Sequence, residues 1–293
     1  MGLRLLGSCI GLSLLTSSTK LNLLWSFPVG EKVDTPAFAQ LLLPPVKIVG
    51  SSLQRVRHAL ALHSGRSYPG WAREIARQWQ GLPYGSGGKG LGPQELLLNL
   101  EQMDCMTAVE NLMALHLTHQ HQTSSIQDFI RFLSEVRYQA LPPCRWEDRY
   151  HYLTHAFIEW EEKGWGSWLP FGSPESREVF YITKHRKNYS GFSDWHFIKA
   201  IEARLSSHPR YCISSERIGE WLPFLQDGDL IAFVSSEEGL DVSHVGVFFW
   251  EKDRPTFAHA SLRAKKWVYG EDLCAYLDRR KSKIKGICVF RPF

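Results

Sequence analysis

Five short segments with the pattern of β-strands lie close together in the last third of this 293-residue chain, and they constrain its fold more than any other feature. They are rich in β-branched and aromatic residues, and turn-forming residues separate them. A run of closely spaced strands favours an antiparallel sheet over alternating βαβ units. The segments cover residues 229–234, 244–250, 256–260, 266–269 and 286–290.

Helical patterns dominate the first half of the chain. A capping box at residues 124–128 precedes the fourth helix, whereas residues 141–208 are rich in aromatic residues, glycine and proline and show no clean period. These patterns predict an α+β fold in which residues 40–293 form a single domain, with N-terminal helices and a C-terminal antiparallel sheet. The expected helices cover residues 51–63, 71–79, 104–119, 126–138 and 271–280.

The first 39 residues have the pattern of a secretory signal. Arg4 supplies a positive start, and the apolar run at residues 5–15 is too short to span a bilayer but fits the core of a signal peptide. Cleavage is expected near residues 16–18 or after the Ala-Phe-Ala sequence at 37–39. The segment predicts a protein exported to the periplasm or cell envelope; a disordered N-terminus without a targeting role is the alternative.

The composition excludes several classes of protein. Hydrophobic residues make up 44% of the chain and charged residues 22%, as in an ordinary folded protein. A net charge of +4 is too weak a bias to indicate nucleic acid as a partner. The six cysteines include no CxxC pair, so zinc-finger and thioredoxin-like spacings are absent. Removal of the signal would take Cys9 and leave five, which implies at least one unpaired thiol.

Cys105 is the cysteine with the most informative surroundings. Asp104 before it is a preferred N-cap residue, so Cys105 is expected in the first turn of an amphipathic helix. There, backbone N–H groups and the helix dipole favour a thiolate, and a low thiol pKa suits a nucleophile. A buried structural thiol is the alternative for Cys105, and we retain it for the others. These are Cys144, Cys212, Cys274 and Cys288.

Two of the twelve histidines lie on neighbouring predicted strands. If Trp250 pairs near Pro255, His244 lies opposite Ser261, and His259 becomes its diagonal neighbour on the same face. Diagonal side chains on paired strands are within reach of each other, whereas a slip of one residue would place the two imidazoles on opposite faces. The pair is therefore a candidate for a base and its orienting partner. The alternative is two core histidines that bond to the backbone.

With these residues, the chain resembles the NlpC-type peptidoglycan hydrolases, which have a papain-like fold. The similarity lies in a "DC" at a helix start, "SHVG" on one strand and "HAS" on the next, together with upstream "GxPY" and "GDL" elements. In this chain they are Asp104-Cys105, Ser243-His244-Val245-Gly246, His259-Ala260-Ser261, Gly81-Leu82-Pro83-Tyr84 and Gly228-Asp229-Leu230.

A closer similarity is to an amidase-like branch of that superfamily. Its motifs are matched at residues 95–100, 104–110 and 239–246. The resemblance implies a papain-like α+β fold and cleavage of the bond between N-acetylmuramic acid and L-alanine in peptidoglycan or its fragments. The aromatic middle of the chain, with Trp146, Trp160, Trp165 and Trp168, departs from the pattern that we can align.

The resemblance also implies a role for each candidate residue. Cys105 would be the nucleophile, His244 the base and His259 its orienting partner, with no metal or other cofactor. The backbone N–H of Cys105 and the hydroxyl of Tyr84 would stabilise the oxyanion. An endopeptidase cutting between D-Glu and the diamino acid, and a non-catalytic wall-binding module, are the alternatives. Asp104, Asp241, Ser243 and Ser261 are expected contacts to substrate.

Other patterns carry weaker signals. Residues 85–90 match GxGxxG but lack the preceding strand that dinucleotide binding needs, so a loop near the cleft is the better interpretation. The histidines at 116, 119 and 121, and at 151 and 155, lack the partners of a metal site. The basic residues of 279–285 are interpreted as a solvated helix end, with a weak attraction to anionic wall polymer as the alternative. Arg149, His151 and Tyr152 are either pocket residues or ordinary structural ones.

Overall fold

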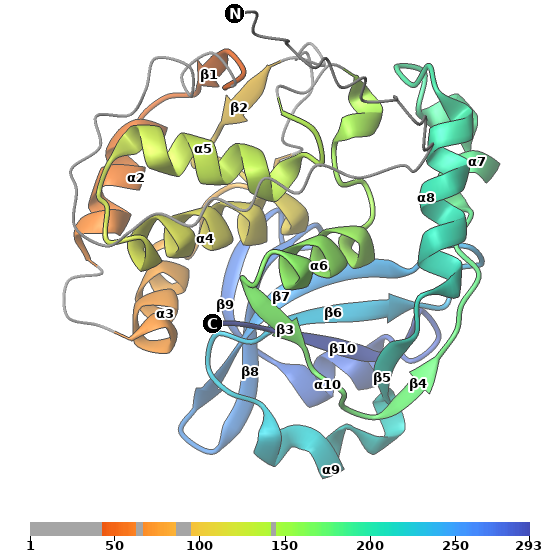
Figure 1. The fold of residues 1–293 in the computed structure, drawn as a ribbon. Helices are drawn as coiled ribbons and strands as arrows, with labels where there is room; N and C mark the ends of the chain where they lie inside the picture. Colours follow the sequence, from red (N-terminus) through yellow and green to blue (C-terminus); the bar gives the residue numbers. More distant parts are fainter. Residues whose placement is uncertain (1–42, 63–66, 86–94, 142–144) are drawn as a thin grey trace, which may run out of the picture.

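The computed structural model describes residues 43–62, 67–85, 95–141 and 145–293, drawn in colour in Figure 1. The expected signal segment and most of the glycine-rich stretch at 85–90 lie outside these residues. Within them, no helix is both long enough and apolar enough to cross a membrane.

One antiparallel sheet forms the centre of the fold (Figure 1). Its strands follow the order β4-β5-β10-β6-β7-β8-β9, with β3 paired to β10 beyond this path. The antiparallel sheet and the mixed α+β class are as predicted from the strand pattern. The strands are β3 (Gly166–Trp168), β4 (Ser173–Glu175), β5 (Arg210–Ser214), β6 (Leu230–Ser235), β7 (Val242–Glu251), β8 (Arg254–Ser261), β9 (Lys266–Asp272) and β10 (Ile284–Pro292). A separate parallel pair joins β1 (Val46–Ile48) and β2 (Leu96–Leu98).

Helices cover both faces of this sheet. Figure 1 shows α4, α5 and α6 on one side and α10 on the other. The first face belongs to a large core with the N-terminal helices, and the second packs on α9 and α10 in a smaller core. The helices are α2 (Ser52–Ala61), α3 (Tyr68–Gln78), α4 (Cys105–Gln120), α5 (Ile126–Arg137), α6 (Leu153–Glu162), α7 (Tyr181–Lys184), α8 (Trp195–Ser207), α9 (Ile218–Trp221) and α10 (Leu273–Arg279).

The β7–β8 hairpin has the predicted register. Trp250 pairs with Pro255, and a two-residue turn containing Lys252 at φ 57° joins the strands. A positive φ is common in two-residue hairpin turns, because it matches their twist to that of the strands. The same register carried toward residue 244 brings His244 and His259 to one face of the sheet.

Helix α4 differs from the amphipathic helix that the sequence predicts. From Thr107 to Thr118 every residue is buried, including the polar side chains of Glu110, Asn111 and His116. The reason is its position, since α5, α2 and strands β7 and β8 all pack against it. Apolar spacing along α4 therefore could not reveal which side faces the sheet.

The aromatic middle contributes to the core. The interval without a clean period contains α6 and α8, and strand β3 adds to the edge of the sheet. Trp160 is fully buried, and Trp165 and Trp168 are each only 9% exposed. Trp168 packs edge-on against Phe157 of α6, with ring centroids 5.6 Å apart. These three tryptophans fill space between α6 and the sheet, and none of them lines a described cavity beside the histidines.

Candidate active site

Cys105 is the first residue of α4, as the sequence predicts. The carboxylate of Asp104 accepts hydrogen bonds from the backbone N–H of Thr107 at 2.8 Å and from its hydroxyl at 2.8 Å. The Thr107 hydroxyl in turn accepts a bond from the backbone N–H of Asp104 at 2.9 Å, which completes a capping box. Asp104 thus fixes the start of the helix and, with it, the position of the thiol.

The thiol of Cys105 has a raised pKa, in contrast to the low value expected at a helix start. Burial is the largest cause, and the nearby Asp104 carboxylate adds to it, so the pKa is about 12. Hydrogen bonds from the backbone N–H groups of Val245, Met106 and Cys105 act in the opposite direction but do not outweigh burial. The resting site therefore holds a neutral thiol, and the Val245 contact places it beside the residue that follows His244.

His244 and His259 lie together, as the hairpin register predicts. His244 Nε2 is 2.6 Å from His259 Nδ1, and the two rings meet nearly edge-on at 80°. His259 Nε2 is 2.7 Å from a carboxylate oxygen of Glu271, whose other oxygen accepts a bond from Arg279 at 2.7 Å. The hydrogen bond from His259 is the largest cause of a lowered pKa at Glu271, which is therefore ionised at neutral pH.

This line of bonds fixes the tautomer of both imidazoles. An ionised Glu271 can only accept, so His259 donates to it from Nε2 and keeps a lone pair on Nδ1. His259 Nδ1 then accepts from His244 Nε2, which leaves the lone pair of His244 on Nδ1. Burial, followed by the nearby His259 and Arg280, lowers the pKa of His244 well below its usual range, so the ring is neutral. His244 Nδ1 is thus prepared to accept a proton.

Glu271 is not among the site residues predicted from the sequence, because the local pattern places it at the start of a helix. In the structure β9 continues to Asp272, and Glu271 pairs with Phe257 of β8. Phe257 and His259 share a face of β8, so Glu271 is a diagonal neighbour of His259. A longer β9 alone would not have revealed this, because the regular register of β8 with β9 places Glu271 opposite Thr256, on the other face. The register shifts between Phe257 and His259, and this irregularity brings Glu271 to the side of the histidines.

Aromatic rings hold the two histidines in place. The ring of Phe233 lies stacked on His244 at a centroid distance of 5.6 Å. Tyr276 of α10 contacts the rings of both His259 at 5.6 Å and His244 at 6.2 Å. Both Phe233 and Tyr276 are buried. These contacts restrict imidazole rotation, which a positioned base requires.

Gly246 lets the two histidine-bearing strands approach closely. A Cβ atom built there would lie 2.8 Å from the Ala258 carbonyl oxygen and 3.3 Å from the Cβ of His259. We expect Gly246→Ala to lower stability by about 1–3 kcal/mol through overpacking and to reduce kcat by moving His259. Thermal unfolding and steady-state kinetics check this result. Gly219→Ala is the control, since nothing lies within 4 Å of a Cβ there; equal losses in both variants would contradict the prediction.

The other predicted site residues divide between the site and elsewhere. Burial raises the pKa of Tyr84 to about 12, and the negative charge of Asp104 and of a Cys105 thiolate, when one forms, adds to this effect, so the hydroxyl stays protonated. Ser243 and Ser261 line the cavity beside the histidines. Asp241 does not belong to this group: it is buried, accepts a bond from the Thr154 N–H at 3.2 Å and lines a separate small cavity beside Cys212 and Cys288.

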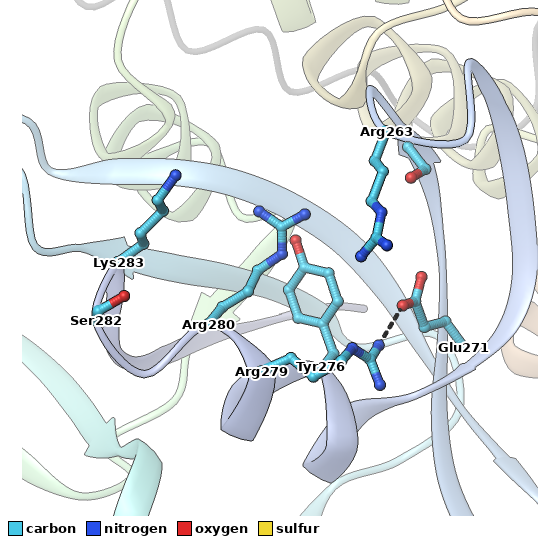
Figure 2. A pocket seen from close by; sticks show the side chains of 8 residues that line it. Arg263, Glu271, Tyr276, Arg279, Arg280, Ser282 and Lys283 are labelled. Carbon is cyan, nitrogen blue, oxygen red and sulfur yellow. Dashed lines mark hydrogen bonds and ion pairs between the residues drawn. The ribbon is translucent and has the colours of Figure 1, made fainter.

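Two cavities adjoin the histidines. The larger, of about 500 Å³, is lined by His244 and His259 together with serines and basic residues. The smaller, of about 270 Å³, shares several of these residues and includes Glu271. Figure 2 shows the side chains of the smaller one, with the Arg279–Glu271 ion pair at its side and the Tyr276 ring at its centre.

The middle-segment candidates have structural partners. Arg149 bonds to the fully buried carboxylate of Glu110, which also receives a bond from Arg137 at 2.7 Å. His151 bonds to the Trp146 carbonyl oxygen, and the Tyr152 hydroxyl donates to Glu202. Arg149, His151 and Tyr152 line neither of the two cavities. In the part of the chain that the structure describes, no three His, Cys, Asp or Glu side chains are grouped as a metal site would need.

The two pKa shifts predict how the site responds to pH. His244 must be neutral to act as a base, and its pKa is lowered. The midpoint of the acid limb in the pH profile of kcat/KM should therefore lie below pH 6.5.

The raised pKa of Cys105, about 12, predicts how the thiol reacts with an alkylating agent. The rate of its alkylation by iodoacetamide should keep rising through pH 9 without a plateau near neutrality. Labelling of the Cys105→Ala variant corrects for the other thiols. An alkylation rate that levels off, with the midpoint of its rise below pH 7, would instead indicate a preformed thiolate.

Comparison with known proteins places this geometry in a family. Residues 74–287 match the family described as AmiA-like, N-acetylmuramoyl-L-alanine amidase-like. An N-acetylmuramoyl-L-alanine amidase from Bacteroides uniformis has a similar structure, with 26% identity, a TM-score of 0.70, and coverage of 77% of this chain and 98% of its own. No match was found among curated proteins.

Two further solved structures share the fold. One, from Bacteroides fragilis, carries a provisional xylanase name; it is 26% identical over 75% of this chain and 99% of its own, with a TM-score of 0.66. A Legionella pneumophila protein is 18% identical over 82% of this chain and 94% of its own, with a TM-score of 0.61, and supports the fold alone. Since the family match covers most of the chain and includes Cys105, His244, His259 and Glu271, this protein belongs to the AmiA-like, N-acetylmuramoyl-L-alanine amidase-like family.

Proposed function

We propose that this protein is a cysteine-dependent amidase that hydrolyses the bond between N-acetylmuramic acid and L-alanine in peptidoglycan or muropeptide fragments. The observation that carries the proposal is the hydrogen-bonded line from His244 through His259 to Glu271, with the Cys105 thiol held next to it by the Val245 N–H. Membership of an amidase-like family and the similarity to the Bacteroides uniformis amidase support the choice of bond.

In the first step, Cys105 attacks the lactyl carbonyl carbon while its proton passes to His244 Nδ1. The thiol and the imidazole are both neutral at rest, so proton transfer accompanies attack. The imidazolium that forms gains stability through His259 from the negative charge of Glu271. The Cys105 N–H and the protonated Tyr84 hydroxyl are the donors that we assign to the oxyanion.

In the second step, His244 donates its proton to the departing L-alanine nitrogen. The C–N bond breaks, the stem peptide leaves with a neutral amine, and the muramoyl group remains on Cys105 as a thioester. Water, deprotonated by the again neutral His244, then attacks the thioester carbonyl. The thiolate leaves and recovers the proton, which restores the resting thiol. The chemistry uses no metal ion, so a chelator is expected to leave the rate unchanged.

The proposal includes the fold type and the place of action. Cys105 at a helix start and His244 and His259 on adjacent antiparallel strands support a papain-like, NlpC-type arrangement. Export to the periplasm or cell envelope is the proposed localisation, as the substrate requires contact with the cell wall or its fragments. The signal segment on which it rests lies outside the described residues.

Mass spectrometry of the products from a purified muropeptide tests the choice of bond. The amidase releases an intact stem peptide that begins with L-alanine and leaves free N-acetylmuramic acid. An endopeptidase of the same fold would leave L-Ala-D-Glu on the sugar, and this product would contradict the proposal. No product from any muropeptide, with intact folding shown by circular dichroism, would favour a non-catalytic wall-binding module.

A further inference from the structure

The two cavities beside the catalytic histidines share a basic lining. Arg263, Arg280 and Lys283 line both, and Ser261 and Tyr276 are also common to them. The cavities thus form one recess, which we call the basic recess. It adjoins the imidazoles of His244 and His259 on the α10 side of the sheet.

The charges of this recess are poorly balanced. Arg279 is paired with Glu271, whereas Arg263, Arg280 and Lys283 have no ion-pair partner among the described residues. The only other acidic side chain in the described lining is that of Glu237, which is exposed. Unpaired positive charges around a concave site attract an anion.

Three separate segments supply these charges. Arg263 comes from the β8–β9 loop, Arg280 from the end of α10, and Lys283 from the turn before β10. Figure 2 shows the Arg263 and Arg280 guanidinium groups on either side of the Tyr276 hydroxyl, with the Lys283 amine beyond Arg280. The guanidinium of Arg280 lies over the Tyr276 ring, 4.9 Å from its centroid, which holds it next to the site. Neighbouring Lys281 and Lys285 are exposed and line neither cavity.

The chemistry of the reaction indicates which part of the substrate enters the recess. His244 must reach the departing nitrogen, so that nitrogen lies next to the imidazole. The described lining of the recess contains His244 and His259 but not Cys105, which keeps the acyl group. The leaving group is therefore directed into the recess. In the proposed reaction, the leaving group is a peptide whose second residue, D-Glu, carries a free carboxylate.

We propose that Arg263, Arg280 and Lys283 form a subsite that binds the carboxylates of the leaving stem peptide and so selects acidic over amidated peptides. This inference rests on the proposed amidase function and deepens it. It also replaces the interpretation of residues 279–285 as only a solvated helix end, since Arg280 and Lys283 face the site while Lys281 and Lys285 do not. A volume of about 500 Å³ is in the range of small-molecule sites, and is large enough for a dipeptide.

The test compares two substrates that differ in charge. N-acetylmuramoyl-L-Ala-D-Glu carries both glutamate carboxylates, and its diamide has nearly the same shape but neither charge. Charge-assisted hydrogen bonds are worth about 1.5–3 kcal/mol, so we expect kcat/KM to be about 10- to 100-fold higher for the acid. The full-length protein is used in every arm.

Variants assign this preference to the recess. Lys283→Gln should lose about tenfold or more in kcat/KM for the acid and leave kcat/KM for the diamide nearly unchanged. Arg280→Gln should lose as much for the acid and clearly less for the diamide, where only its effect on the His244 pKa remains. Lys281→Gln is the matched control, because it removes the same charge from the same turn outside the recess. Lys283 is exposed, so its variant should fold even if Arg280→Gln does not. Calorimetric binding of the product dipeptide L-Ala-D-Glu gives a second measurement that is independent of turnover.

The outcomes separate the two proposals. If the wild-type protein cleaves the acid and the diamide equally well, and the recess variants match Lys281→Gln, the subsite is wrong while the amidase function stands. If Arg280→Gln and Lys283→Gln lower kcat/KM equally for the acid and the diamide, the two residues act on folding or on His244 and not on a carboxylate. This outcome also overturns the inference. If the wild-type protein cleaves neither substrate nor any larger muropeptide, the proposed function itself fails.

Discussion

Replacing Cys105 with alanine should abolish hydrolysis of the muramoyl–alanine bond, with a loss of at least ~10⁴-fold in kcat. The physical reason is that no other described side chain can form the acyl intermediate where Cys105 lies, at the start of α4 beside Val245. Removing the nucleophile leaves only positioning and oxyanion stabilisation, which retain a small part of the rate. Release of intact stem peptide, followed by mass spectrometry, measures the loss.

A second cysteine provides the matched control for this experiment. Cys274 is a half-buried free thiol on α10 and lines neither cavity of the basic recess. Cys274→Ala should keep wild-type kcat within about twofold, because surface-near changes away from a site have small effects. Thermal unfolding should show that Cys105→Ala stays folded. Near-normal turnover by a folded Cys105→Ala protein would contradict the cysteine mechanism.

Replacing Glu271 with glutamine should lower kcat by about 10²- to 10⁴-fold while leaving the fold intact. Glutamine fills the same volume but has an NH₂ group that can donate to His259 Nε2. That bond would reverse the donor and acceptor roles along the hydrogen bonds from Glu271 to His244. His259 would then donate from Nδ1 to His244 Nε2. The proton of His244 would then sit on Nδ1, where the base needs a lone pair. The upper limit is taken from the loss that a reversed tautomer causes in a serine protease triad.

A neighbouring carboxylate serves as the control for the glutamate variant. Asp272 caps α10 by accepting a bond from the Ala275 N–H at 2.8 Å, and asparagine caps helices equally well. Asp272→Asn should therefore remove one negative charge without changing kcat. The ¹⁵N chemical shifts of His244 give a readout that a purely structural role would not move, because Nδ1 and Nε2 exchange their protonated state. Unchanged shifts and unchanged kcat in Glu271→Gln would show that Glu271 does not orient the base.

Much of the fold followed from local patterns. The strand segments at 229–290 are all present, and the hairpin register of Trp250 with Pro255 is confirmed. The helix that begins at Cys105 is also confirmed, because Asp104 caps it through contacts within one turn. Such features depend on residues that are close in sequence or paired across a two-residue turn, so their geometry can be read from spacing.

The sequence by itself determined that His244 and His259 share a face and that Cys105 opens a helix. Only the tertiary structure decided the rest. It joined Glu271 to His259 through a β9 strand longer than its pattern indicated, and it gathered Arg263, Arg280 and Lys283 from three segments around one recess. It also raised the thiol pKa to about 12, because burial depends on every element that packs around α4 and outweighs the local effect of a helix start.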